Sequence, residues 1–234
     1  MQSLSPGRPK GLPVLAWLCA GLIGVAAPAA ALLLLAGEGA PAATGTLGGP
    51  ILAVGLMGVG MIGAAAAGSL RVGVALALLA GAGLLLLGAL LGITSLPQPL
   101  ATALAMCVAS ISFAVRGALF ARSAADKGWW IALFVVLGEV AILATAFALP
   151  GALPDWLLAL LPAQWASVSI RTSLSGAPLL AAGAPLAALG GTAAATHLVA
   201  RLWPRRWPYL VMFTAWLGFS ALVWHHTAPP PPPA

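Results

Sequence analysis

The sequence predicts an all-α, polytopic transmembrane helical bundle of about seven spans. Hydrophobic residues make up 62% of the chain, charged residues only 6%, and the mean hydropathy is +1.07, whereas an ordinary soluble domain has roughly 25% charged residues. The apolar residues occur in long unbroken runs rather than in short alternating segments. Runs of about 20 such residues cross a bilayer as helices, in which the backbone groups are hydrogen-bonded within the segment.

Seven apolar runs make residues 12–225 a single predicted transmembrane domain. The first run follows a basic stretch, but it is longer than the roughly 7–15 apolar residues of a cleaved signal peptide, so we expect it to be a retained span. The predicted spans are residues 12–36, 50–69, 72–93, 99–121, 129–149, 176–200 and 208–225.

The basic residues predict the orientation. With residues 1–11 as a cytoplasmic tail, only Arg171 of the ten Lys and Arg residues falls away from the cytoplasmic side. Because Lys and Arg accumulate in cytoplasmic loops, we predict an inside N-terminus, an outside C-terminus with a proline-rich tail at 226–234, and a bacterial-type inner membrane. The net charge of +6 is spread beside the spans, so no nucleic-acid partner is expected.

The segment 151–174, between the fifth and sixth spans, is too short and too often interrupted by proline to cross the membrane. Asp155 after Pro154 is a good helix N-cap, and Pro162 is expected to end that helix after about two turns. We therefore predict a short interfacial helix on the outer surface, with Trp156 and the neighbouring leucines in lipid. The alternative is a lid over an outward-facing cavity.

The second and third spans carry small residues at four-residue spacing. These are Gly60, Ala64 and Gly68 in the second span, and the pairs Ala77–Gly81 and Gly88–Gly92 in the third. Such spacing lets helix backbones approach closely in lipid. It predicts either a tight centre of this bundle or a face that binds a second copy of the chain or another membrane protein.

Glu139 lies in the middle of the fifth predicted span. A charged side chain at mid-bilayer costs on the order of 3 kcal/mol, so it is expected to face protein or water and to have a partner. In an antiparallel hairpin of spans four and five, Ser112 is level with Glu139, and Arg116 lies one turn nearer the cytoplasm on the same helix face as Ser112. Arg116 can either pair with Glu139 or extend to the headgroups.

Three interpretations of this group remain open. Glu139, Arg116 and Ser112 form a buried polar clasp, line a proton or substrate pathway, or meet a partner subunit across an interface. His197 and Arg201 share a face of the sixth span near its cytoplasmic end, where extension to the interface is favoured over a proton relay. No metal-ligand or cofactor-binding spacing is present in the sequence, so neither a metal nor a cofactor is expected.

Three functions fit these features. The first is a small permease or ion-coupled carrier with Glu139 and Arg116 in its pathway. The second is a non-catalytic accessory or assembly subunit that recognises a membrane partner through its small-residue faces. The third is a membrane-embedded lipid-modifying enzyme, which would need two positioned polar groups at one depth, a requirement that Glu139 and Ser112 barely meet.

Overall fold

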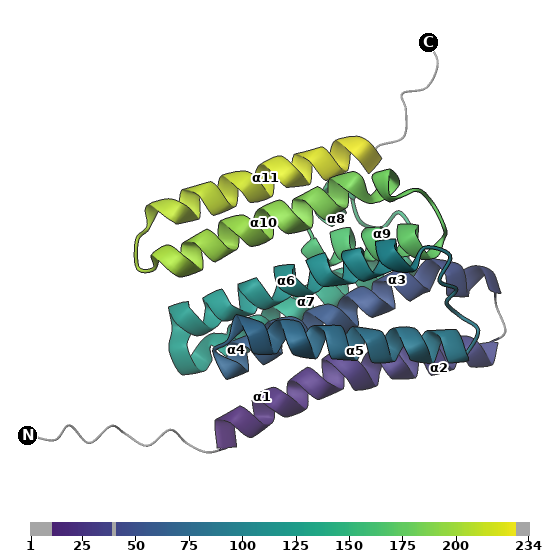
Figure 1. The fold of residues 1–234 in the computed structure, drawn as a ribbon, viewed down its shortest axis with the longest axis horizontal. Coiled ribbons are helices and arrows are strands. Elements are labelled where there is room, and N and C mark those ends of the chain that lie inside the picture. The colour runs from purple at the N-terminus through teal and green to yellow at the C-terminus, as the bar shows by residue number, and fades with distance from the viewer. Residues whose placement is uncertain (1–10, 39–40, 228–234) are drawn as a thin grey trace, which may run out of the picture.

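The computed structural model describes residues 11–38 and 41–227, and the predicted all-α class is confirmed because this part of the chain has helices and no strand. The long helices lie side by side in one bundle (Figure 1). The helices of the bundle are α1 (Gly11–Gly21), α2 (Ala27–Glu38), α3 (Pro41–Met57), α5 (Leu70–Leu90), α6 (Pro99–Ala124), α7 (Gly128–Ala148), α10 (Gly183–Leu202) and α11 (Trp207–Thr227). The short α4 (Gly63–Ala67) precedes α5, and α8 (Asp155–Ala159) and α9 (Pro162–Leu174) lie between α7 and α10.

Five stretches of these helices are long and apolar enough to cross a membrane. They are Val14–Gly37, Leu47–Ala67, Leu70–Leu90, Pro99–Ala148 and Trp207–His226. The fourth stretch contains both α6 and α7, which are joined by a single turn of 3-10 helix, η3 (Ala125–Lys127). The sixth predicted span corresponds to α10, which is not among the five; polar residues such as Thr192 and Thr196 lie within it. The helices are those of a membrane protein.

Two of the membrane-length helices contain a π-helical turn. The turn η1 (Leu22–Ala26) joins α1 to α2, and η2 (Gly58–Ile62) joins α3 to α4. The two turns are in contact, and a Cβ atom built on Gly58 would lie only 2.9 Å from the Cα of Gly24. Glycine at both positions therefore allows the backbones of η1 and η2 to touch in the middle of the two membrane-length stretches that contain them.

The small residues predicted to form close helix contacts lie in η2, α4 and α5, and several of them pack within the chain. Gly60 packs against Ala77 and Phe113, and Gly81 packs against Leu56. Gly68 has a different role, because its φ of 63° is left-handed and it ends α4 just before α5 begins. Gly60 and Gly81 of these predicted faces thus pack inside the chain, whereas a Cβ atom built on Gly68 or Gly92 would have open space around it.

The segment 149–175 re-enters the bundle, and we call it the re-entrant segment. The helix α8, which begins at Asp155, ends at Ala159, before Pro162; Pro162 is also the first residue of a second helix, α9, a position where its missing N–H costs nothing. Trp165 of α9 is fully buried, whereas Trp156 of α8 is 54% exposed. Only α8 therefore retains a surface position, while α9 packs against α3, α6, α7 and α10.

Small residues explain why α9 lies inside rather than on the surface. A Cβ atom built on Gly49 of α3 would lie 2.7 Å from the carbonyl oxygen of Ser167, so the two helices meet backbone to backbone. The hydroxyl groups of Ser169 and Ser173 donate to carbonyl oxygens of α9 itself, at 2.8 and 2.7 Å, which satisfies them without water. Close packing of this kind stabilises helix pairs in an apolar solvent.

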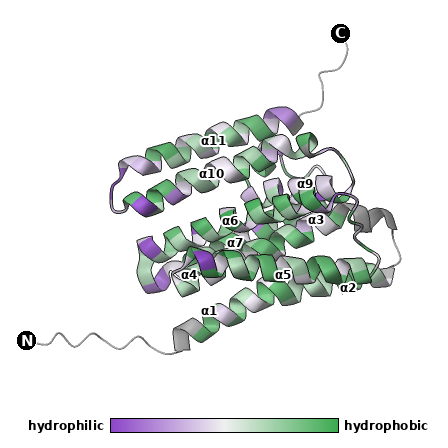
Figure 2. Cartoon of the chain, in the orientation of Figure 1, coloured by the Kyte–Doolittle hydropathy of each residue, from purple (hydrophilic) through white to green (hydrophobic). Residues whose placement is uncertain are grey.

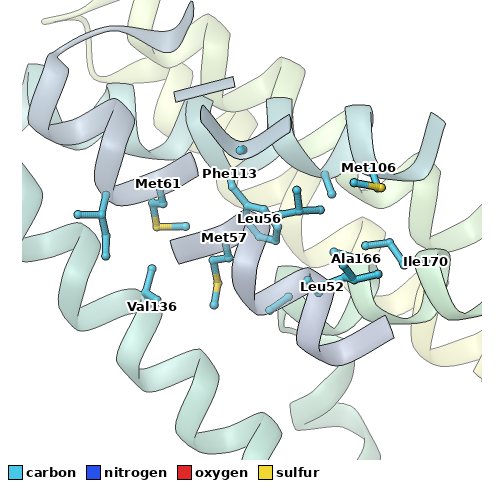
Figure 3. Packing of buried hydrophobic residues seen from close by; sticks show 14 of the residues in the cluster. Leu52, Leu56, Met57, Met61, Met106, Phe113, Val136, Ala166 and Ile170 are labelled. Atoms are coloured by element: carbon cyan, nitrogen blue, oxygen red, sulfur yellow. The ribbon is translucent and has the colours of Figure 1, made fainter. Parts of the chain in front are cut away.

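The apolar core is built around α3 and η2. Figure 3 shows Leu56, Met57 and Met61 between Phe113 of α6 and Val136 of α7. Ala166 and Ile170 of α9 belong to the same buried cluster. The re-entrant segment is thus part of the core and holds the helices that carry the polar residues described below.

The basic residues of the helices gather mainly at one end of the bundle. Figure 2 shows hydrophilic residues where α4 meets α5, where α6 turns into α7 and where α10 ends. Arg71, Arg122 and Arg201 occupy these three places. The predicted cytoplasmic tail up to residue 10, with Arg8 and Lys10, and the proline-rich tail from residue 228 lie outside the described residues.

Candidate functional site

Glu139 lies near the middle of α7 on its inward-facing stripe. The buried residues Ala132, Val136, Glu139 and Leu143 recur at intervals of three or four positions, which places them on one helix face. Glu139 is 8% exposed. A buried carboxylate requires hydrogen-bond donors or an opposite charge nearby, because its desolvation is otherwise unfavourable.

The hydrogen-bond partner of Glu139 is the N-terminus of α9. The backbone N–H of Ala163 donates to Oε2 of Glu139 at 2.9 Å. Leu161, at the N-cap position, has no side-chain oxygen for this purpose, and Pro162 has no N–H. Glu139 therefore caps α9 from a neighbouring helix, and its negative charge also complements the positive end of the α9 dipole.

This contact sets the depth of the re-entrant segment. Glu139 precedes Ala148, the last residue of α7, by nine positions, which is about 14 Å of helix. At the other end of α9, Ser173 accepts a hydrogen bond from Thr102, near the start of α6, at 3.1 Å. The helix α9 thus runs from the middle of the bundle to one end and is a half-helix rather than a span.

Arg116 joins α6 to α10. Its guanidinium donates to the hydroxyl oxygen of Ser112 at 2.8 Å and to that of Thr192 at 3.0 Å. Thr192 is buried, and its own hydroxyl donates to the carbonyl oxygen of Ala188 at 2.7 Å. The guanidinium therefore has oxygen acceptors on both helices, in a place where the charge is shielded from the surrounding lipid.

The structure divides the predicted clasp into two separate contacts. Ser112 and Arg116 do meet, but within the described residues no ion pair within 4.0 Å links Arg116 to Glu139. Glu139 joins α7 to α9, while Arg116 joins α6 to α10, and the two opposite charges attract each other only through space. The predicted contact between Arg116 of α6 and Glu139 of α7 is therefore not formed. Arg116 is bonded to α10 instead, and Glu139 to α9.

Sequence reasoning missed both partners, Ala163 and Thr192. Ala163 contributes a backbone group, which has no signature in the sequence; the available signal was Pro162, a residue favoured at the first position of a helix. Thr192 is a polar residue inside a predicted span, which is the same signal that identified Ser112.

His197 and Arg201 lie on α10 at the basic end of the bundle. Together with Arg122 of α6 they line a cavity of about 180 Å³. A guanidinium nitrogen of Arg122 donates to the carbonyl oxygen of Ala200, which fixes this side chain across the gap between α6 and α10. Glu139 does not line this cavity.

The buried Glu139 carboxylate is a group that can bind a proton or a cation. The buried carboxylate has one N–H donor and a second oxygen, and no group of three His, Cys, Asp or Glu side chains comes together within residues 11–38 and 41–227. No family model, curated protein or solved structure is significantly similar to this chain, so the chemistry of the site is the guide to function.

Proposed function

We propose that this protein is a small permease or ion-coupled carrier of a bacterial-type inner membrane, with seven spans, an inside N-terminus and Glu139 as its proton- or cation-binding group. One observation carries the proposal: a buried carboxylate in mid-helix caps a half-helix that ends inside the bundle. In carriers, the N-termini of half-helices near the membrane midplane face anionic groups, and Glu139 is such a group at the N-terminus of α9.

The coupling follows from the hydrogen bond between Glu139 and Ala163. A proton or metal cation on the carboxylate withdraws electron density from Oε2 and removes the negative charge that complements the α9 dipole. Loading Glu139 therefore weakens the contact between α7 and the re-entrant segment. Unloading restores that contact, so the strength of the contact between α7 and α9 depends on the state of Glu139.

The alternatives have less support. An accessory subunit was inferred from the small-residue faces, and residues such as Gly60 and Gly81 pack inside the chain. A lipid-modifying enzyme was inferred from Glu139 together with Ser112, and Ser112 bonds to Arg116 instead.

The proposal is tested by measuring transport currents in proteoliposomes adsorbed on a solid-supported membrane. A panel of amino acids, sugars and monovalent and divalent cations is applied with and without a pH gradient. We expect the wild type to give a current with at least one solute or with protons, and Glu139→Gln to reduce that current at least about tenfold, since the amide has no charge to exchange. Asp126→Asn, the same change in an exposed turn, is the control. An equal current from Glu139→Gln would overturn the role of this residue.

The orientation is tested with two single-cysteine variants. Ser95 lies in the connection between α5 and α6, Ser123 lies near the turn between α6 and α7, and both are exposed. In a background with Cys19 and Cys107 replaced by alanine, we expect a membrane-impermeant maleimide to label Ser95→Cys in intact cells, and Ser123→Cys only after lysis. The reverse pattern contradicts the inside N-terminus.

A further inference from the structure

A basic cavity opens between α6 and α10 at the end of the bundle where positive charge gathers. It is lined by Arg122, His197 and Arg201 together with apolar and small residues, and by no acidic side chain. Arg122 and Arg201 are exposed at its mouth. A guanidinium has five N–H donors, and the bond of Arg122 to the Ala200 carbonyl uses one of them. The cavity therefore has the charge and the donors to bind an anionic group such as a phosphate.

A second, apolar cavity of about 380 Å³ continues from the basic one. The two share Leu70, Val115 and His197 in their linings. The apolar cavity is lined by one face of α6 and one face of α10, at the positions Val108, Ile111, Val115, Gly190, Ala193, Ala194 and His197. Ile111 is 44% exposed and Ala194 is also exposed, so this groove is open along the side of the bundle.

The combined groove has the dimensions of a lipid in one leaflet. Val108 and Arg122 are fourteen positions apart on α6, which corresponds to about 21 Å of helix. The hydrocarbon of one leaflet is about 15 Å thick, half of a core of roughly 30 Å. A headgroup at Arg122 and a chain along the groove toward Val108 therefore fit the same helix pair.

We propose that this groove binds an anionic phospholipid, with its phosphate at Arg122, His197 and Arg201 and one acyl chain between α6 and α10. A free phosphate would use only the basic cavity, whereas the continuous apolar groove complements hydrocarbon. Basic pockets between membrane helices on the cytoplasmic side attract anionic lipids of that leaflet. Because Arg116 and Thr192 join the same two helices one to two turns away, a lipid here stabilises the contact that holds Arg116.

Native mass spectrometry of the full chain in detergent tests the site with phosphatidylglycerol, phosphatidylcholine and inorganic phosphate as probes. We expect phosphatidylglycerol to bind and the double variant Arg122→Ala/Arg201→Ala to bind at least about tenfold less. Arg205→Ala/Arg206→Ala removes the same charge from the nearby connection and should bind as the wild type does. Equal losses in both double variants, or equal binding of phosphatidylcholine, would overturn the proposal.

The double variant Arg122→Ala/Arg201→Ala loses the bond from Arg122 to Ala200 and could unfold for that reason. A variant in the apolar groove tests the proposal independently of this bond. Ala194→Phe places a ring in the apolar groove and leaves Arg122, His197 and Arg201 in the sequence, and we expect it to reduce phosphatidylglycerol binding at least about fivefold. Binding of inorganic phosphate should not change in this variant. Wild-type phosphatidylglycerol binding in Ala194→Phe, or phosphate binding as tight as that of the lipid, identifies a simple anion site and refutes the lipid site.

Discussion

The contact of α9 with α3 and the contact of α6 with α10 are built in opposite ways. In the first, Gly49 brings two backbones together and the carboxylate of Glu139 closes the end of α9. In the second, Arg116 reaches from one helix to a hydroxyl of the other, and two cavities lie beside it. The first contact is a close backbone approach at Gly49, whereas the second has both space and charge beside it.

The comparison shows that two kinds of helix contact differ in how they stabilise a membrane protein. Close contact of small residues gains dispersion energy and fixes two helices in one position. A polar contact with gaps depends on a few hydrogen bonds, each worth about 1 kcal/mol in a membrane, so it yields more easily to a ligand or a movement. The α3–α9 contact is thus the rigid part of the bundle and the α6–α10 contact the adaptable part.

The largest effect is expected from a side chain introduced at the tight contact. Gly49→Val should lower the free energy of unfolding by about 3 kcal/mol, because its Cβ meets the Ser167 carbonyl and the Arg171 Cβ at 2.7 and 2.8 Å. Reversible unfolding in mixed micelles measures this change. Gly48→Ala is the neighbouring control, since its Cβ lies 3.5 Å from Thr94 and needs no rearrangement. Equal losses at both positions would refute the special role of Gly49.

Removal of the cap on α9 should have the next largest effect. Glu139→Leu leaves the buried N–H of Ala163 without an acceptor and should cost about 2 kcal/mol in the same unfolding assay. Glu139→Gln retains a carbonyl oxygen that accepts this bond, and we expect it to cost about half as much. A variant Glu139→Leu as stable as Glu139→Gln would show that the contact contributes little to stability.

The smallest effect is expected at the adaptable contact. Thr192→Val removes the oxygen that accepts from Arg116 and should cost about 1 kcal/mol. Thr196→Val is the matched control, because the Thr196 hydroxyl donates only to the Thr192 carbonyl of its own helix and should cost under about 0.5 kcal/mol. If Thr196→Val costs as much as Thr192→Val, the link from Arg116 to α10 is not what stabilises this helix pair.

The membrane class, the positions of most long helices and the unusual residues could be predicted from the sequence. Apolar runs mark helices because the bilayer interior leaves no other way to satisfy the backbone, so predicted ranges such as 129–149 agree closely with α7 (Gly128–Ala148). Glu139 was recognisable as important because a carboxylate in such a run needs a partner. Ser112 and Arg116 could be paired because positions four apart share a helix face.

The identity of each partner was decided by the tertiary structure. Ala163 is 24 positions from Glu139, and Thr192 is 76 positions from Arg116, so neither pair has a local signature. The sequence also did not determine whether a helix begins at Pro162, because proline can end one helix or begin the next. Hydropathy governs which segments leave water, but lipid tails are as apolar as the helix faces. Which faces meet therefore depends on shape and on the few polar groups that must be satisfied.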